Sequence, residues 1–156
     1  MPKIDPNASK KLVALTFDDG PSPYTDKLLG ILDKYGVKAT FFVTNCDPGC
    51  QYDIKKEFKA GHAIAAHTYT HSYGTIYRST SAFWNDHEKI QGVIKKQTGQ
   101  RTSMMRFPGG SSNMVSLEYN KGIMTRLTKK LPELGYQYFD WNVDSNDAGG
   151  AKDADE

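Results

Sequence analysis

Two adjacent carboxylates and two imidazoles spaced four residues apart could together do metal-assisted chemistry. Asp18 and Asp19 follow an apolar run, and His67 and His71 come later in the chain. These residue types suit a metal site with a general base beside it. The apolar run, residues 12–17, predicts a buried strand that carries both carboxylates to its C-terminal end. Because neighbouring side chains of a strand point to opposite sides, one carboxylate could bind a cation while the other handles a proton.

Length and composition bound the class of protein. The 156 residues, 38% of them apolar, are enough for a single domain with its own core. No stretch reaches the roughly 20 apolar residues that a membrane-spanning helix needs. The net charge is +2 and no basic stripe is present, so nucleic acid is not an expected partner. The chain begins without a signal-peptide pattern, and we interpret residues 1–11 as a linker or the remnant of one.

Alternating patterns predict strands separated by helices. The expected strands cover residues 12–17, 37–43, 62–67, 104–107 and 136–143. The expected helices cover residues 25–35, 54–59, 83–98 and 124–134, and residues 73–80 are expected to form a surface connection. This alternation implies an α/β fold with a parallel sheet, and chemistry at several strand ends is typical of a βα barrel.

Two cysteines lie close together in the sequence. Cys46 and Cys50 enclose a turn-forming tripeptide, so they could form a small disulfide loop or remain two free thiols. A zinc site on this pair is the weaker interpretation, because the chain has no further cysteine and neither flank carries a histidine.

Four motifs in order carry a resemblance to a known family. They read Thr-Phe-Asp-Asp-Gly-Pro-Ser, His-Thr-Tyr-Thr-His, Arg-Phe-Pro-Gly-Gly and Trp-Asn-Val-Asp-Ser-Asn-Asp. Over about residues 12–147 the chain resembles the polysaccharide deacetylases of the NodB-homology type, carbohydrate esterase family four. The resemblance implies one catalytic domain with a distorted seven-stranded (β/α) barrel. Since only five strands are predicted, we expect residues 1–156 to hold a barrel that is incomplete at its C-terminus.

The resemblance implies a metal site. Asp19, His67 and His71 would bind one divalent metal, zinc first and cobalt or nickel as alternatives, with positions left open for water and a substrate carbonyl. We expect the two imidazoles to meet on one side of a helical turn, with the carboxylate arriving from another strand. Asp18 would then act as the base for a water whose pKa the metal lowers to about 7.

The later motifs imply supporting roles. By resemblance, Arg106 would hold the base Asp18 in place, and the backbone N–H of Gly109, where many family members have tyrosine, would stabilise an oxyanion. Trp141 resembles the tryptophan of the substrate groove, and Asp147 resembles the carboxylate that tunes the family's catalytic acid.

Two of these assignments have alternatives. Trp141 could equally pack in the core, because the whole predicted strand around it is aromatic. Asp140 and Asp144 compete with Asp147 for the tuning role.

The family's catalytic acid has no counterpart here. Family members normally carry a leucine-x-histidine motif beyond the Asp147 position, and its histidine protonates the departing amine. All four histidines of this chain lie before residue 88. We interpret His62 as structural, because it lies on the other strand face from His67, and His87 as a solvated residue of a polar helix face. The missing strands and acid are expected on a lost segment or on a companion C-terminal polypeptide.

The resemblance implies an activity and a substrate class. The expected reaction is metal-dependent removal of N-acetyl groups from N-acetylglucosamine units of a polysaccharide, first peptidoglycan and next chitin-like oligomers. Such a substrate implies an extracellular or cell-surface location. Two alternatives are a catalytically inactive fragment that binds carbohydrate or metal, and a metal amidase that acts on a non-sugar amide.

Overall fold

The structure, a computed structural model, describes residues 12–149 and contains one parallel sheet. Its strands lie side by side in chain order, and every neighbouring pair is parallel. The predicted α/β class and the parallel sheet are confirmed. Within the described range, each edge strand has one neighbour, so the sheet is an open part of a barrel. The strands are β1 (Thr16–Asp18), β2 (Thr40–Val43), β3 (Ala63–Ala66), β4 (Met104–Met105) and β5 (Gln137–Tyr138).

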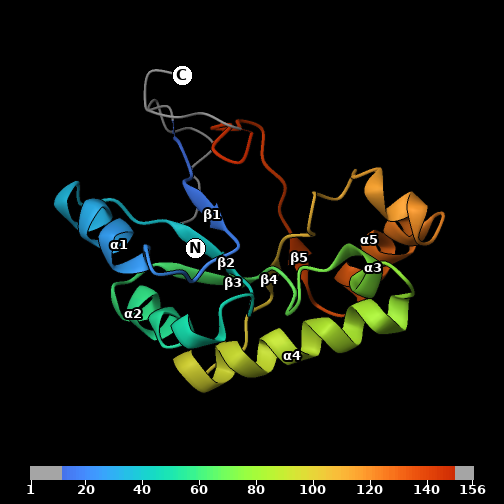
Figure 1. Cartoon of the computed structure of the whole chain (residues 1–156), viewed down its shortest axis with the longest axis horizontal. Coiled ribbons are helices and arrows are strands. Elements are labelled where there is room, and N and C mark those ends of the chain that lie inside the picture. The colour runs from blue at the N-terminus through green and yellow to red at the C-terminus, as the bar shows by residue number, and fades with distance from the viewer. Residues whose placement is uncertain (1–11, 150–156) are drawn as a thin grey trace.

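Helices follow the strands and cover one side of the sheet. In Figure 1, α2 and α4 run below the sheet, and the red segment after β5 passes above it. Local signals set the ends of α4: the Ser79 side chain accepts a hydrogen bond from the Ala82 N–H at 3.0 Å, and Gly99 ends the helix at φ 85°. No helix between residues 12 and 149 is long and apolar enough to span a bilayer. The helices are α1 (Thr25–Lys34), α2 (Asp53–Lys59), α3 (Tyr73–Ile76), α4 (Thr80–Thr98) and α5 (Ile123–Glu133), with 3-10 turns at Pro48–Cys50 and Val115–Glu118.

Strand register separates the core from the chemistry. Phe17, Phe41 and Ile64 are aligned across β1, β2 and β3 and pack in the layer between sheet and helices. The next residue along each strand points to the opposite side of the sheet. That second row contains Asp18, aligned with Phe42 and Ala65.

Two predicted strands are shorter than expected. The buried strand predicted over residues 12–17 is wrong in its first part, since Leu12 and Val13 are 63% and 83% exposed. The first hydrogen bond to β2 is the one that the Leu15 carbonyl oxygen accepts from the Thr40 N–H at 3.0 Å, and the paired residues of β1 begin at Thr16. The last strand, predicted over 136–143, covers only Gln137–Tyr138, and the last hydrogen bond to β4 is donated by the Phe139 N–H to the Met105 carbonyl oxygen at 3.0 Å.

The segment predicted as a surface connection, residues 73–80, contributes two residues to the core, while Gly74, Thr75 and Arg78 are exposed as expected. Residues Tyr73–Ile76 form α3, and Ile76 and Tyr77 are fully buried. The Tyr77 hydroxyl donates a hydrogen bond of 2.7 Å to the carbonyl oxygen of Pro108. The local sequence is short and polar and does not indicate that the loop after β4 covers Ile76 and Tyr77.

The prediction that His87 is solvated is also wrong. His87 is fully buried, and its ring packs against Phe83, Trp84 and Tyr136, the last at 4.8 Å between ring centroids. Burial lowers the pKa of His87 to about 4, so the ring is neutral near pH 7. Only tertiary packing covers this face of α4, which is why the local sequence pattern did not indicate burial.

Cys46 and Cys50 are both free thiols, which is one of the two alternatives left open by the sequence. The Cys50 thiol lies 3.3 Å from the Asp47 carboxylate, and the Cys46 thiol lies 3.8 Å from the carbonyl oxygen of Thr70.

A buried acid lies beneath the sheet. Glu57 of α2 is fully buried, and neither carboxyl oxygen has a hydrogen-bond partner among residues 12–149. Burial is the main cause that raises the pKa of Glu57 to about 8, and the nearby Asp53 raises it further. Glu57 is therefore mostly protonated at neutral pH, because an unpaired buried charge would be far more costly.

Replacing Glu57 by Gln should therefore stabilise the fold in a pH-dependent way. The folded chain holds this proton up to a pKa of about 8 against an ordinary value of 4.5. The stability that this bound proton contributes is fully present below pH 4.5. It falls by about 1.4 kcal/mol per pH unit above that value and is lost as pH rises through 8. In urea unfolding, Glu57→Gln should exceed the parent by about 3 kcal/mol at pH 7 and match it near pH 4.5.

The exposed Glu88 provides a matched control for that series. The difference in free energy of unfolding between Glu88→Gln and the parent should not change with pH in this way. Equal pH slopes for the parent and Glu57→Gln would contradict a protonated Glu57.

Candidate functional site

Three potential metal ligands converge at the C-terminal edge of the sheet. One ligand atom from each of Asp19, His67 and His71 lies within 4.8 Å of the other two. The Asp19 carboxylate is 3.3 Å from Nε2 of His71 and 3.6 Å from Nε2 of His67. Asp19 follows β1 and the histidines follow β3. Parallel strands end at the same edge, which brings these distant parts of the sequence together.

The orientation of His67 suits a metal ligand. Its Nδ1 lies 2.8 Å from the carbonyl oxygen of Arg106, which can only accept, so Nδ1 carries the proton and Nε2 keeps a lone pair. Burial lowers the pKa of His67 and favours the neutral ring. Ligating histidines commonly donate their other N–H to a carbonyl in this way. The residues present therefore fit a divalent cation.

The local backbone differs from two expectations. The prediction that Asp18 and Asp19 face opposite sides is wrong: both carboxylates face His67, with oxygens 3.8 Å and 3.6 Å from its Nε2. Alternation ends at Asp19 because its φ is +68°. The helical turn predicted for the histidine pair is also wrong, because Thr68 and His71 have φ of +70° and +51° within a loop. Such left-handed residues cost about 1–3 kcal/mol each.

A buried acid that the sequence reasoning missed holds the histidine loop. Asp86 of α4 accepts hydrogen bonds from the N–H groups of Tyr69 and Thr70 at 2.6 Å and 3.2 Å. Its second carboxylate oxygen accepts from the Thr70 hydroxyl at 2.8 Å. A signal was available, because Asp86 lies three residues after Phe83 and four before Ile90 and so on the apolar face of its helix.

The end of β2 joins the two ligand loops. Thr44 donates its N–H to the carbonyl oxygen of Gly20 at 2.8 Å and its hydroxyl to that of Asp19 at 3.1 Å. The next N–H, of Asn45, donates to the carbonyl oxygen of Tyr69 at 3.0 Å. Because β2 lies between β1 and β3, these contacts fix both loops from the middle strand. The sequence analysis did not single out Thr44 or Asn45.

The structure brings Arg106 and Asp18 together. The Arg106 side chain is 4% exposed, and its guanidinium donates to the Asp18 carboxylate at 2.7 Å and to the Thr16 hydroxyl at 3.0 Å. It also donates to the carbonyl oxygens of Phe139 and Asp140 at 2.9 Å and 3.3 Å. One carboxylate oxygen of Asp18 is thus held by Arg106, and the other lies toward His67.

Gly109 presents an unpaired donor near the site. It has φ +76°, and within residues 12–149 its N–H has no protein acceptor, whereas the Gly110 N–H donates to the carbonyl oxygen of Phe107 at 2.8 Å. A Cβ at Gly109 would lie 3.0 Å from the Tyr73 hydroxyl and 3.1 Å from Cβ of Asn113. Both the conformation and the space therefore require glycine here.

Trp141 and its acidic neighbours lie at the rim. The Trp141 ring is 44% exposed and lies 5.4 Å from the Arg106 guanidinium, so it borders the site rather than filling the core. The Asp140 carboxylate accepts from the Ser111 N–H at 2.9 Å and from its hydroxyl, which ties it to the Gly109 loop. Asp147 accepts from the Ser145 hydroxyl at 2.7 Å, and among the described contacts it reaches neither Asp18 nor Arg106.

Asp144 likewise bonds within its own turn, accepting from the Asn146 N–H at 2.8 Å. Of the three acids considered from the sequence, Asp140 is thus the one that contacts a site loop.

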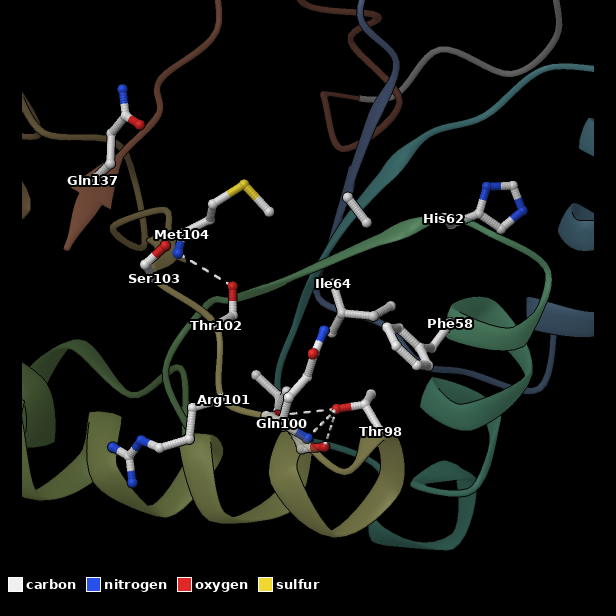
Figure 2. Close-up of a pocket in the computed structure, with 12 residues that line it drawn as sticks. Phe58, His62, Ile64, Thr98, Gln100, Arg101, Thr102, Ser103, Met104 and Gln137 are labelled. Atoms are coloured by element: carbon white, nitrogen blue, oxygen red, sulfur yellow. Dashed lines mark hydrogen bonds between the residues drawn. The ribbon is translucent and has the colours of Figure 1, made fainter. Parts of the chain in front are cut away.

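One cavity lies away from the ligands. About 530 Å³ in volume, it is bordered by the amino ends of β3, β4 and β5, and Figure 2 shows Met104 and Gln137 on one side and Phe58 and His62 on the other. The structural role predicted for His62 is confirmed, since its Nδ1 accepts from the Ala39 N–H at 3.2 Å. A second cavity, about 290 Å³, is bordered by Asp18, Asp19 and Glu57 and so adjoins the ligand cluster.

Removing the Asp86 carboxylate should weaken metal binding. In Asp86→Ala the N–H groups of Tyr69 and Thr70 lose their acceptor, so the strained loop that carries His71 should relax. We expect metal affinity to fall about 10- to 100-fold, the usual effect of losing an outer-shell partner. Chelator competition measures this affinity.

Two further variants sharpen that experiment. Asp86→Asn should retain most of the affinity, since its carbonyl oxygen still accepts from both N–H groups. Glu88→Gln changes an exposed acid of the same helix and should have no effect. Unchanged affinity in Asp86→Ala would show that the loop holds its shape without this carboxylate.

Comparison with known proteins agrees with this geometry. A family model described as polysaccharide deacetylase matches residues 5–137. A peptidoglycan-N-acetylglucosamine deacetylase of Bacillus cereus is 33% identical over 139 residues, which cover 88% of this chain and 48% of that protein. A chitin deacetylase of Arthroderma benhamiae is 36% identical over 141 residues, covering 86% of this chain and 34% of that protein.

A solved structure shares the fold. The crystal structure of the catalytic domain of peptidoglycan N-acetylglucosamine deacetylase from Eubacterium rectale superposes with a TM-score of 0.86 at 51% identity, covering 92% of this chain and 69% of that one. The chain spans about half the length, 48%, of the Bacillus cereus relative. The resemblance drawn from the four motifs is confirmed. The match over residues 5–137, most of the chain, shows that this protein belongs to the polysaccharide deacetylase family.

Proposed function

We propose that this chain carries the catalytic site of a metal-dependent hydrolase that removes N-acetyl groups from N-acetylglucosamine residues of a polysaccharide, with peptidoglycan preferred over chitin-like oligomers. One observation carries the proposal. The Asp18 carboxylate, held by Arg106 at 2.7 Å, lies beside a cluster of one carboxylate and two imidazoles whose ligand atoms lie within 4.8 Å of one another. The names of the relatives in Bacillus cereus and Eubacterium rectale support the substrate class.

The cluster would hold one divalent cation through Asp19, His67 and His71. Two nitrogen ligands and one oxygen ligand suit zinc, and they also accept cobalt or nickel. When bound, the cation supplies Lewis acidity, which lowers the pKa of water and polarises the acetyl carbonyl.

The remaining groups accept the proton, stabilise the developing negative charge and position the sugar. Asp18 takes the proton of the attacking water, because Arg106 holds one oxygen of this carboxylate in place and the other oxygen lies near the cluster. The Gly109 N–H donates to the oxygen of the acetyl carbonyl as negative charge develops on it. The exposed ring of Trp141 offers an apolar face on which a sugar can pack.

The proton for the departing amine requires another group. Neither His62 nor His87 can supply it, since both are buried and their rings pack against the core residues Phe41 and Phe83. We assign this step to a histidine that residues 1–156 do not provide, on a further segment of the protein or on a companion polypeptide, and leave to Asp147 the tuning of that histidine. Acetate release by a preparation whose native mass equals that of the single chain would exclude the companion.

The proposed substrate also implies a location. Peptidoglycan lies outside the cell membrane, so an enzyme acting on it would work at the cell surface. Fractionation of cells that produce the protein tests this, and recovery from the cytosol alone would exclude it.

Asp18→Asn should separate metal binding from turnover. The variant keeps all three ligands but lacks a base, so metal content should match the parent while acetate release falls by about 10²- to 10⁴-fold. His71→Ala should lose both together. Metal analysis and acetate release from N-acetylglucosamine oligomers give the two readings.

The same assay separates the competing functions. Retained turnover in Asp18→Asn would show that another group is the base. Binding of oligomers by the metal-loaded parent without acetate release would support a binding function instead. Faster hydrolysis of small non-sugar amides than of oligomers would support an amidase.

A further inference from the structure

Tyr73 lies between the ligand cluster and the loop after β4. It is the first residue of α3 and follows His71 by two positions. Its ring meets the His71 ring edge-on, with centroids 5.6 Å apart, and contacts the Tyr77 ring at 5.8 Å. These two contacts hold the ring in one place beside a metal ligand.

The Tyr73 hydroxyl points to Gly109. A Cβ built at Gly109 would lie 3.0 Å from this hydroxyl and 3.4 Å from the adjoining ring carbon. A side chain at position 109 would therefore occupy the place that Tyr73 fills from the other loop. The glycine and the tyrosine are complementary, and together they bring a phenol hydroxyl next to the Gly109 amide.

Both donors are available to a ligand. Among the hydrogen bonds of residues 12–149, the Tyr77 hydroxyl donates to the Pro108 carbonyl, whereas the Tyr73 hydroxyl has no protein acceptor. The Gly109 N–H is likewise unpaired in the described part of the chain. A tyrosine hydroxyl can donate a hydrogen bond. One oxygen that gains negative charge can accept hydrogen bonds from two such donors, and both belong to the contact between Tyr73 and Gly109.

We propose that the Tyr73 hydroxyl is a second donor to the acetyl oxygen of the substrate, acting beside the Gly109 N–H as a catalytic residue. This assignment rests on the proposed deacetylase function. It adds to that function a side-chain donor from the histidine loop, so the acetyl oxygen is held from β3 and β4 together. In the alternative, the Tyr73 hydroxyl bonds to a hydroxyl group of the sugar, and that hydrogen bond would be equally strong before and during the reaction.

Tyr73→Phe tests the proposal because it removes one oxygen and keeps the ring against His71. With N-acetylglucosamine oligomers, kcat should fall about 10- to 100-fold while KM stays within about twofold, since the bond strengthens in the transition state. A raised KM at unchanged kcat would assign the hydroxyl to a sugar contact and overturn the proposal.

A second reading does not depend on turnover. Acetate, which carries the same oxygen, can be titrated into the cobalt-loaded protein and followed by the visible absorption of the metal. Tyr73→Phe should bind acetate about 3- to 10-fold more weakly than the parent, the effect of one hydrogen bond. Unchanged acetate affinity, or loss of the metal itself, would contradict the proposal. If the parent releases no acetate, the proposed function fails while this titration still decides the role of Tyr73.

Tyr119→Phe is the matched control. Tyr119 packs against α3 at Gly74, where its ring would lie 3.2 Å from an added Cβ, and it is 45% exposed. Removing its hydroxyl makes the same chemical change beside the same helix but away from Gly109. Turnover and acetate affinity should both equal those of the parent.

Discussion

The buried charge of Arg106 is the constraint on which the site depends. A guanidinium removed from water must be surrounded by acceptors, because an uncompensated buried charge is strongly destabilising. Arg106 finds the Asp18 carboxylate at the end of β1 and the carbonyl oxygens of Phe139 and Asp140 after β5. Its own carbonyl oxygen accepts from Nδ1 of His67. One residue at the end of β4 thus sets the position of the base, the tautomer of a ligand and the path of the last segment.

The ligands are held in a different way, by strained loops that are clamped. Asp19 and His71 both have left-handed backbone conformations, which favour unfolding of their loops. Hydrogen bonds from the buried side chains of Thr44 and Asp86 oppose that tendency, since each pairs a polar group of a ligand loop. The strain persists because neighbouring elements over-determine the loops, and the result is a set of ligand atoms already gathered before any cation arrives. The ligand loops are therefore less stable than relaxed loops would be, but their ligand atoms are preorganised for a cation.

Much of this arrangement could be predicted from the sequence, for a physical reason. Apolar runs ended by turn residues are local signals, so the order of strands and the residues at their ends followed directly, and strand alternation assigned His62 to the structural side. Alternation failed at Asp19, where φ turns positive and no local pattern records it. The burial of His87 and Tyr77 depends on layers contributed by distant residues. Asp86 was missed because an acid in a helix reads as solvated until its partners are known.

The two faces of the sheet explain why such different environments can lie so close. Phe17 and Asp18 are consecutive, yet one packs against helices and the other meets Arg106, because strand neighbours point to opposite sides. On the chemical face, Asp18 is aligned with Phe42, and the Arg106 guanidinium lies 4.1 Å from that ring. An aromatic face attracts a cation without neutralising it, so the carboxylate of Asp18 remains the charge partner. The base is thus fixed by a strand and its arginine partner, whereas Asp19 and His71 lie on loops that depend on the side chains of Thr44 and Asp86.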